Sequence, residues 1–221
     1  DQTVVLLGGG DFNTPIRYMP FIASWGGTWL GKGRTTKADL ALNFHLRDVI
    51  GNEEDFANKR FKGRSNYAYL RSNVSHTQTW QQGWGMHIRA GAQITSQPLI
   101  SNEQLAIGGA ETVRGYLEST ALGDVGATAG LEAFTPNYAK VLSDSITDLH
   151  FLAFIEGGQV RVRQPLPGQD DRFTLAGAGV GVRIKGWQGA LAELDWARAL
   201  KNAGTVRSGD NRVHFRLGYE W

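Results

Sequence analysis

The sequence predicts an all-β protein, an antiparallel transmembrane β-barrel, and three observations predict this class. Apolar and polar residues alternate with a period of two in many segments, and we find no long stripe with the 3.6-residue period of a helix. The alternating segments run for about 10 to 15 residues, whereas an ordinary soluble strand has about 5 or 6. Short turns and long loops follow one another along the chain, as they do in outer-membrane barrels.

The alternation and the turn signals predict about ten strands. In chain order they cover residues 2–8, 16–29, 35–48, 65–79, 84–97, 122–134, 148–163, 171–185, 189–201 and 211–221. Short turns are expected at 30–34, 80–83 and 186–188, and long loops at 49–64, 98–121, 164–170 and 202–210. The connection 135–147 departs from the rule, because it is long where a short turn is expected.

Four of these strands show the two faces most clearly. Their apolar faces take every second residue from Ala38 to Leu46, from Met86 to Ile94, from Ala176 to Ile184 and from Val213 to Trp221. In a soluble sandwich these faces would pack against a second sheet, whereas in a membrane barrel they meet lipid and the polar faces line the lumen. The length of the strands favours the barrel, since a tilted membrane strand needs about 9 to 11 residues.

Tryptophan is expected to mark the membrane boundary. Of the seven tryptophans, five lie next to the short turns or at the C-terminal residue: Trp29, Trp80, Trp84, Trp187 and Trp221. Indole favours the headgroup region, where its ring is apolar and its N–H can still find a partner. These residues predict an aromatic girdle at one rim.

The composition excludes several classes of partner and site. The mean hydropathy is −0.30, and the formal net charge of +2 is too small to argue for a nucleic-acid partner. The chain has no cysteine, so thiolate metal sites and disulfides are excluded. The start of the chain, Asp1-Gln2-Thr3, lacks the features of a signal peptide, and we expect the chain to be a piece of a longer protein.

The sequence shows no residue pattern typical of a catalytic, metal or cofactor site. The five histidines show no metal-ligand spacing, and no serine stands in a nucleophile constellation. The glycine string Gly177–Gly181 lies on a strand, so we interpret it as small inward residues that leave space in the lumen. Glu193 and Asp195 share the lumen face with Arg183 and are expected to balance it. We therefore expect no enzyme, no metal and no cofactor.

The long loop 98–121 carries the candidate functional residues. Gly108 and Gly109 permit positive φ and tight packing. Arg114 offers a rigid fork of donors suited to a buried carboxylate, and Tyr116 combines a flat apolar body with a hydrogen-bonding tip. Such a loop could fold back into a polar lumen and be held there, or it could lie in solvent with a hydrated arginine.

The motifs around this loop resemble one family. Ile107-Gly108-Gly109 followed by Val113-Arg114-Gly115-Tyr116 resembles the sixth-loop signature of two-partner-secretion transporters, which export haemolysins and filamentous haemagglutinins. The resemblance extends from about residue 56 to the C-terminus and includes Gly123–Gly126 and Phe154–Gly157, where Glu156 stands at a position that is commonly Asp. Gly218, Tyr219 and Trp221 look like the C-terminal signal that the barrel assembly machinery reads.

The resemblance implies a fold and a site. The chain would be a single, partial barrel domain over residues 1–221, similar to strands seven to sixteen of a sixteen-stranded barrel, without POTRA domains or the first strands. Arg114 would reach into the lumen and pair with Glu156. Strand parity supports the second half of this pair, because Leu149, Phe151 and Ile155 form the lipid-type face and turn Phe154 and Glu156 inward.

The resemblance also implies a function. The expected protein is a translocator in the bacterial outer membrane that exports an unfolded partner exoprotein through a pore gated by the loop. Its expected partners are that exoprotein, the lipid bilayer with lipopolysaccharide, and the barrel assembly machinery. Three alternatives stay open at this point: an outer-membrane assembly factor of the same superfamily with a similar loop, a passive porin, and a soluble all-β binding domain.

Overall fold

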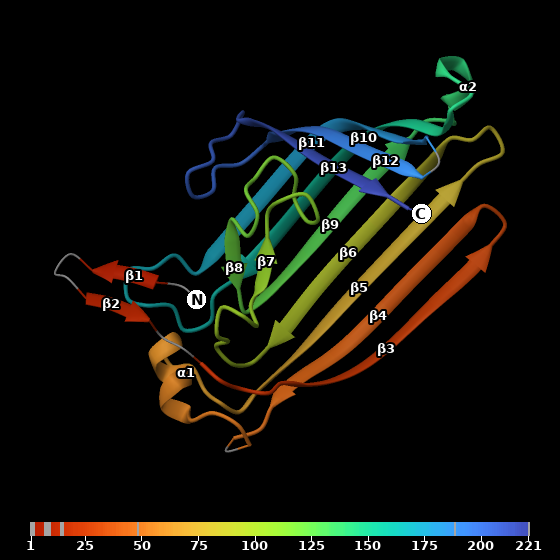
Figure 1. The fold of residues 1–221 in the computed structure, drawn as a ribbon. Coiled ribbons are helices and arrows are strands. Elements are labelled where there is room, and N and C mark those ends of the chain that lie inside the picture. The colour runs from red at the N-terminus through yellow and green to blue at the C-terminus, as the bar shows by residue number, and fades with distance from the viewer. Residues whose placement is uncertain (1–2, 7–9, 14–15, 48, 188, 221) are drawn as a thin grey trace.

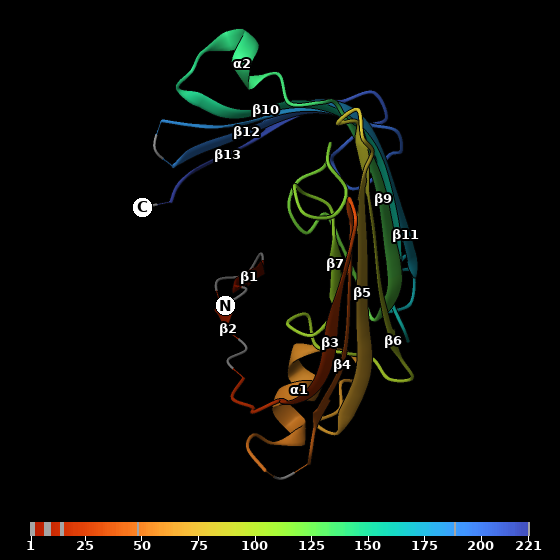
Figure 2. The ribbon, with the colours of Figure 1, turned by 90° about the vertical axis from the view of Figure 1, so that its right-hand side faces the viewer.

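A curved nine-stranded antiparallel sheet forms most of the protein (Figures 1 and 2). The computed structural model describes residues 3–6, 10–13, 16–47, 49–187 and 189–220. Each strand of the sheet pairs with the next one along the chain. The strands are β3 (Phe21–Gly31), β4 (Arg34–His45), β5 (Tyr67–Thr79), β6 (Gly85–Thr95), β9 (Val125–Phe134), β10 (Ile146–Arg161), β11 (Arg172–Gly186), β12 (Ala190–Ala199) and β13 (Asn211–Tyr219).

The remaining elements are short. Two hairpins lie outside the main sheet, β1 (Thr3–Leu6) with β2 (Gly10–Asn13), and β7 (Leu105–Ile107) with β8 (Ala121–Gly123). The helices are α1 (Glu53–Lys59) and α2 (Ala139–Leu142). Among the described residues, no helix is long and apolar enough to cross a membrane.

The predicted first strand, 2–8, is wrong as a strand of the main sheet. Its described part, Thr3–Leu6, pairs with Gly10–Asn13 in a separate hairpin. A strand of four residues is too short to cross a bilayer, which needs about 9 to 11 residues in a tilted strand. The next predicted strand, 16–29, begins only at Phe21. The other eight predicted strands each match one strand of the sheet.

The two faces of the sheet differ as the alternation predicts. Apolar side chains on the convex face are exposed, including Phe215 at 75% and Ile155 at 55%. Polar side chains on the concave face, such as Asn43, Gln93 and Glu156, are buried. The apolar faces therefore do not meet one another in a dry interior, as they would in a soluble sandwich. An exposed apolar band of this kind is typical of a sheet that faces lipid.

The two ends of the sheet also differ. The short turns lie together at one end, at the upper right of Figure 1, and the long loops lie at the other. Trp29, Trp80, Trp84 and Trp187 lie at the short-turn end and are each about half exposed. Trp221 lies outside the described residues. The long connection 135–147 contains α2, and its Ala139 packs on Leu149 and Ile146 of β10.

Two of the apolar clusters lie on the concave side, beneath the loops. One cluster surrounds α1 and consists of Phe56, Tyr67, Tyr69, Leu99 and Ile100. The side chain of Asn52 caps α1 by accepting a hydrogen bond of 2.7 Å from the backbone N–H of Asp55. The second cluster lies beneath the long loop between β6 and β9. These two clusters thus hold the loops on the concave face.

Candidate functional site

The long loop between β6 and β9 returns onto the concave face of the sheet. It leaves the long-loop end, forms the hairpin β7–β8, and lays its tip against the inner side of the sheet (Figures 1 and 2). Three glycines make its path possible, since Gly108, Gly109 and Gly115 have φ values of +106°, +100° and +98°. A Cβ on Gly115 would lie 3.0 Å from the backbone N of Ala199. The tip therefore lies directly on the backbone of β12.

Arg114 at the tip is buried against β10, with 2% of its surface exposed. Its Nε donates to Oε1 of Glu156 at 2.9 Å, and its terminal nitrogen Nη2 contacts the same oxygen. Its backbone N–H donates to Oε2 of Glu156 at 2.8 Å. The guanidinium carbon lies 3.4 Å from the ring centroid of Phe154. The structure thus brings together Arg114, Phe154 and Glu156, which the sequence analysis selected.

Two further carboxylates approach the same guanidinium from other strands. Nη1 of Arg114 donates to Oδ2 of Asp195 at 2.9 Å, and Nη2 lies 3.3 Å from Oε1 of Glu132. Asp195 also accepts two hydrogen bonds from Arg183, at 2.7 and 3.0 Å. Arg114 therefore joins β9, β10 and β12, whereas the sequence indicated only β10.

The surroundings of Arg114 keep it charged. Burial alone would lower the pKa of Arg114, but the hydrogen bonds and charge of Glu156, followed by the charge of Glu132, raise it above its ordinary value. The guanidinium does not titrate while the protein is folded.

Tyr116 anchors the tip two residues further on. Its side chain is fully buried, and its hydroxyl lies 2.8 Å from the carbonyl oxygen of Lys201 and 2.9 Å from that of Ala176. The backbone N–H of Lys201 donates to this hydroxyl at 3.1 Å. The ring packs in an apolar cluster that includes Val113 and Leu175. The hydroxyl thus ties the loop to β11 and to the segment after β12.

The glycine string of β11 provides the space beneath the tip. A Cβ on Gly177 would overlap the carbonyl oxygen of Arg114, and a Cβ on Gly179 would lie 2.6 Å from the ring of Phe154. A Cβ on Gly181 would overlap the carboxylate of Asp195. Gly177 therefore admits the loop itself, whereas Gly179 and Gly181 leave room for the wall residues Phe154 and Asp195, which contact Arg114. This agrees with the interpretation of the string as small inward residues.

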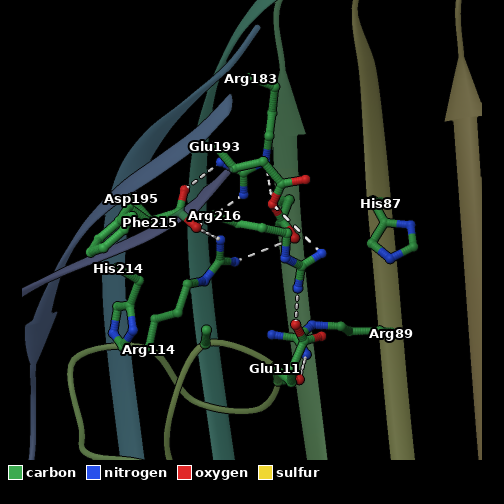
Figure 3. A pocket seen from close by; sticks show the side chains of 12 residues that line it. His87, Arg89, Glu111, Arg114, Arg183, Glu193, Asp195, His214, Phe215 and Arg216 are labelled. Atoms are coloured by element: carbon green, nitrogen blue, oxygen red, sulfur yellow. Dashed lines mark hydrogen bonds and ion pairs between the residues drawn. The ribbon is translucent and has the colours of Figure 1, made fainter. Parts of the chain in front are cut away.

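A polar cavity of about 290 Å³ lies beside the tip (Figure 3). Its charged lining comes from both the loop and the wall and includes Arg89, Glu111, Arg183, Glu193 and Arg216. Among the described residues, no group of three or more His, Asp or Glu side chains is placed to hold a metal ion. The cavity thus lies among side chains of opposite charge from the loop and the wall.

Arg114 and Glu156 lie within a segment that matches a known family. A family model described as "Haemolysin secretion/activation protein ShlB/FhaC/HecB" matches residues 19–184. The chain belongs to this family. The match confirms the resemblance to two-partner-secretion transporters that the loop motifs indicated. No match was found among curated proteins.

Two solved structures share the fold of this family member. CdiB from Escherichia coli has a TM-score of 0.73 and 17% sequence identity, and the match covers 96% of this chain and 38% of that chain. CdiB from Acinetobacter baumannii has a TM-score of 0.63 and 18% identity, and the match covers 89% and 32%. The chain therefore spans less than two fifths of either solved chain.

The base of the loop in this family member is held by Asp124, which the sequence analysis did not select as a site residue. Its carboxylate is fully buried. Oδ1 accepts from the backbone N–H of Leu99 at 2.8 Å and from Nε2 of Gln104 at 3.0 Å. Oδ2 accepts from the backbone N–H of Arg163 at 2.6 Å and from Arg60 at 3.3 Å. The available signal was the Gly-Asp-x-Gly pattern at the start of β9.

Glu103 forms a second set of hydrogen bonds at the loop base. Its carboxylate accepts from the hydroxyl of Tyr18 at 2.5 Å and from that of Tyr69 at 2.7 Å. Burial, together with the hydrogen bond to Glu103 and its charge, raises the pKa of the Tyr18 hydroxyl. Tyr18 therefore remains a hydrogen-bond donor throughout the ordinary pH range. Sequence alternation could not place these three residues together.

The C-terminal residues lie at one edge of the sheet. Gly218 and Tyr219 end β13, where they oppose Leu191 and Ala190 of β12, and Tyr219 is exposed. Trp221 lies outside the described residues. The described end of the chain is thus a strand whose other edge carries no neighbour among the described residues.

Proposed function

We propose that this protein exports an unfolded partner exoprotein, of haemolysin or adhesin type, across the bacterial outer membrane. The pore would be a β-barrel gated by the loop that carries Val113, Arg114, Gly115 and Tyr116. Membership of the family supports this proposal. The observation that carries it is the burial of Arg114 against Glu156 on the concave, polar face of the sheet.

The physical logic follows from the two faces. The convex face presents apolar side chains suited to lipid, and the concave face presents charged and polar side chains that an unfolded chain can slide along without burying unpaired groups. The loop occupies part of this concave face. Release of its tip from Glu156 and Asp195 would open the passage, and folding of the exported chain outside the cell would make the step irreversible without ATP.

We further propose that the chain is a partial barrel within a longer protein. Among the described residues, β3 pairs only with β4 and β13 only with β12, and lipid does not tolerate such open edges. The chain also spans only 38% and 32% of the two CdiB chains. Further strands would close the barrel to sixteen, and POTRA domains would precede them. The full reading frame of the gene tests this proposal directly.

The proposed partners follow from the same arrangement. The bilayer and lipopolysaccharide would contact the convex face. The barrel assembly machinery would read the C-terminal signal with Gly218, Tyr219 and Trp221 during biogenesis. No cofactor and no enzymatic step enter the proposal.

Arg114→Ala and Glu156→Ala test the gating role in the full-length protein. We expect both to lower the amount of exoprotein secreted into the medium while the barrel is still inserted. Arg172→Ala is a matched control, because the side chain of Arg172 is exposed and makes no hydrogen bond or ion pair with the described residues. Export at the parent level by both Arg114→Ala and Glu156→Ala would contradict the proposal. In planar bilayers, a stable open conductance of the parent protein would instead indicate a passive porin.

A further inference from the structure

Arg89 of β6 holds the backbone of the loop just before its tip. Its Nη2 donates to the carbonyl oxygen of Thr112 at 3.1 Å, and its Nη1 contacts the carbonyl oxygen of Glu111. Its Nη2 also contacts the carboxylate of Glu156 (Figure 3 shows Arg89 beside Glu111). All hydrogen bonds of its side chain to the described residues therefore go to the loop or to the carboxylate that binds Arg114.

Glu156 is the shared partner of two arginines, one from the loop and one from the wall of the sheet. Arg114 belongs to the loop and leaves when the loop leaves, whereas Arg89 belongs to the wall and stays. Both contact Oε1 of Glu156, while Oε2 accepts the backbone N–H of Arg114. The carboxylate is fully buried, so its position is fixed by these donors. Each arginine thus orients the group that the other one needs.

We propose that Arg89 is a positioning residue of the gate, a second fastening that keeps residues 111–112 on the wall and presents Glu156 to Arg114. The proposal rests on the proposed gating function and deepens it. Two fastenings act on one loop, one through the side chain at its tip and one through the main chain two residues earlier. Arg89 needs its planar fork for this task, because it serves two carbonyl groups and a carboxylate at once.

The shared carboxylate leads to a specific expectation. Replacing Arg114 alone leaves the loop fastened at 111–112, and replacing Arg89 alone leaves it fastened at the tip. Replacing Glu156 weakens both. Glu156→Gln leaves Arg114 paired with Asp195 and leaves Arg89 on the two loop carbonyl groups, so it should release the loop less than Arg89→Gln and Arg114→Ala combined.

The experiment measures release of the loop in the full-length protein through a single thiol. Val113→Cys places it between the two fastenings, at a side chain that is fully buried. Residues 1–221 contain no cysteine, and any cysteine elsewhere in the full-length protein is replaced by serine. The readout is its labelling rate with a membrane-impermeant maleimide. We expect Arg89→Gln to raise this rate roughly tenfold, because hydrogen bonds to a charged group are lost. Arg89→Lys should give an intermediate rate, since its single nitrogen cannot occupy the positions of both Nη1 and Nη2 of Arg89.

Lys37→Gln is the matched control. It removes one positive charge from the same concave wall, and the side chain of Lys37 forms no hydrogen bond or ion pair with the described residues. Its labelling rate should equal that of the parent. A labelling rate of Arg89→Gln equal to that of the parent would overturn the proposal, and so would equal acceleration by Lys37→Gln.

A second arm covers the case in which Arg89→Gln does not fold, as judged by heat-modifiable gel mobility. Arg89→Lys keeps the charge, and its rate must still exceed that of the parent; an unchanged rate overturns the proposal. The labelling assay does not depend on export. If Arg89→Gln accelerates labelling while export is insensitive to every loop variant, the fastening stands and the gating function fails.

Discussion

At the scale of single residues, the hydroxyl of Tyr116 makes the most specific prediction. Tyr116→Phe keeps the ring in its apolar cluster but removes the partner of the Lys201 and Ala176 backbones. Leaving such groups unpaired costs about 1–3 kcal/mol. We expect backbone amides of residues 113–118 to exchange roughly tenfold faster by hydrogen-exchange mass spectrometry. Tyr138→Phe, whose exposed hydroxyl has no hydrogen-bond partner among the described residues, is the control, and an equal effect of both variants would contradict the prediction.

The same scale shows what the sequence could and could not predict about the site. Parity turned Glu156 inward, and the donor fork of Arg114 pointed to a carboxylate, and the structure brings these two together. Asp195 was placed on the correct face, but alternation does not encode how far a loop reaches along the wall. Arg89 was missed for the same reason. Asp124 was missed because a carboxylate at a strand start looks like an ordinary turn residue.

At the scale of elements, the glycines of β11 predict that the loop can be displaced without breaking the sheet. Gly177→Ala puts a methyl group into the carbonyl oxygen of Arg114, and overpacking of this kind costs about 1–3 kcal/mol. We expect unchanged heat-modifiable mobility but faster proteolysis within residues 105–121. Gly157→Ala on the convex face is the control, since its Cβ would meet only the carbonyl oxygen of Leu175 at 3.5 Å. Equal proteolysis rates of both variants would show that packing of the loop does not depend on the space at Gly177.

Strand alternation predicted the elements of the main sheet well and the elements outside it poorly. Long strands repeat the period-two pattern many times, so their existence and faces follow from the sequence. The strands of β7 and β8 have three residues each, which is too few for a period to show. Helix α1 is also too short for a 3.6-residue stripe, although Asn52 followed by Glu53, Glu54 and Asp55 is a helix-start signal that could have revealed it.

At the scale of the whole molecule, the convex face decides whether this sheet is a membrane wall. Ile155 on the convex face and Asn73 on the concave face are both exposed, so a soluble protein would tolerate lysine at either position with little loss of stability. In a bilayer the two positions are not equivalent, because only the first one places the charge against acyl chains. We expect Ile155→Lys to destabilise the full-length protein in vesicles, with a free energy of unfolding that is smaller by about 2–4 kcal/mol, as for a charge near the bilayer midplane. Asn73→Lys should change it by less than about 1 kcal/mol, because its side chain faces a polar lumen. The free energies of unfolding are measured by urea titration. Equal free energies for the two variants would mean that the convex face does not contact lipid, and the proposed pore on the concave face would then be contradicted.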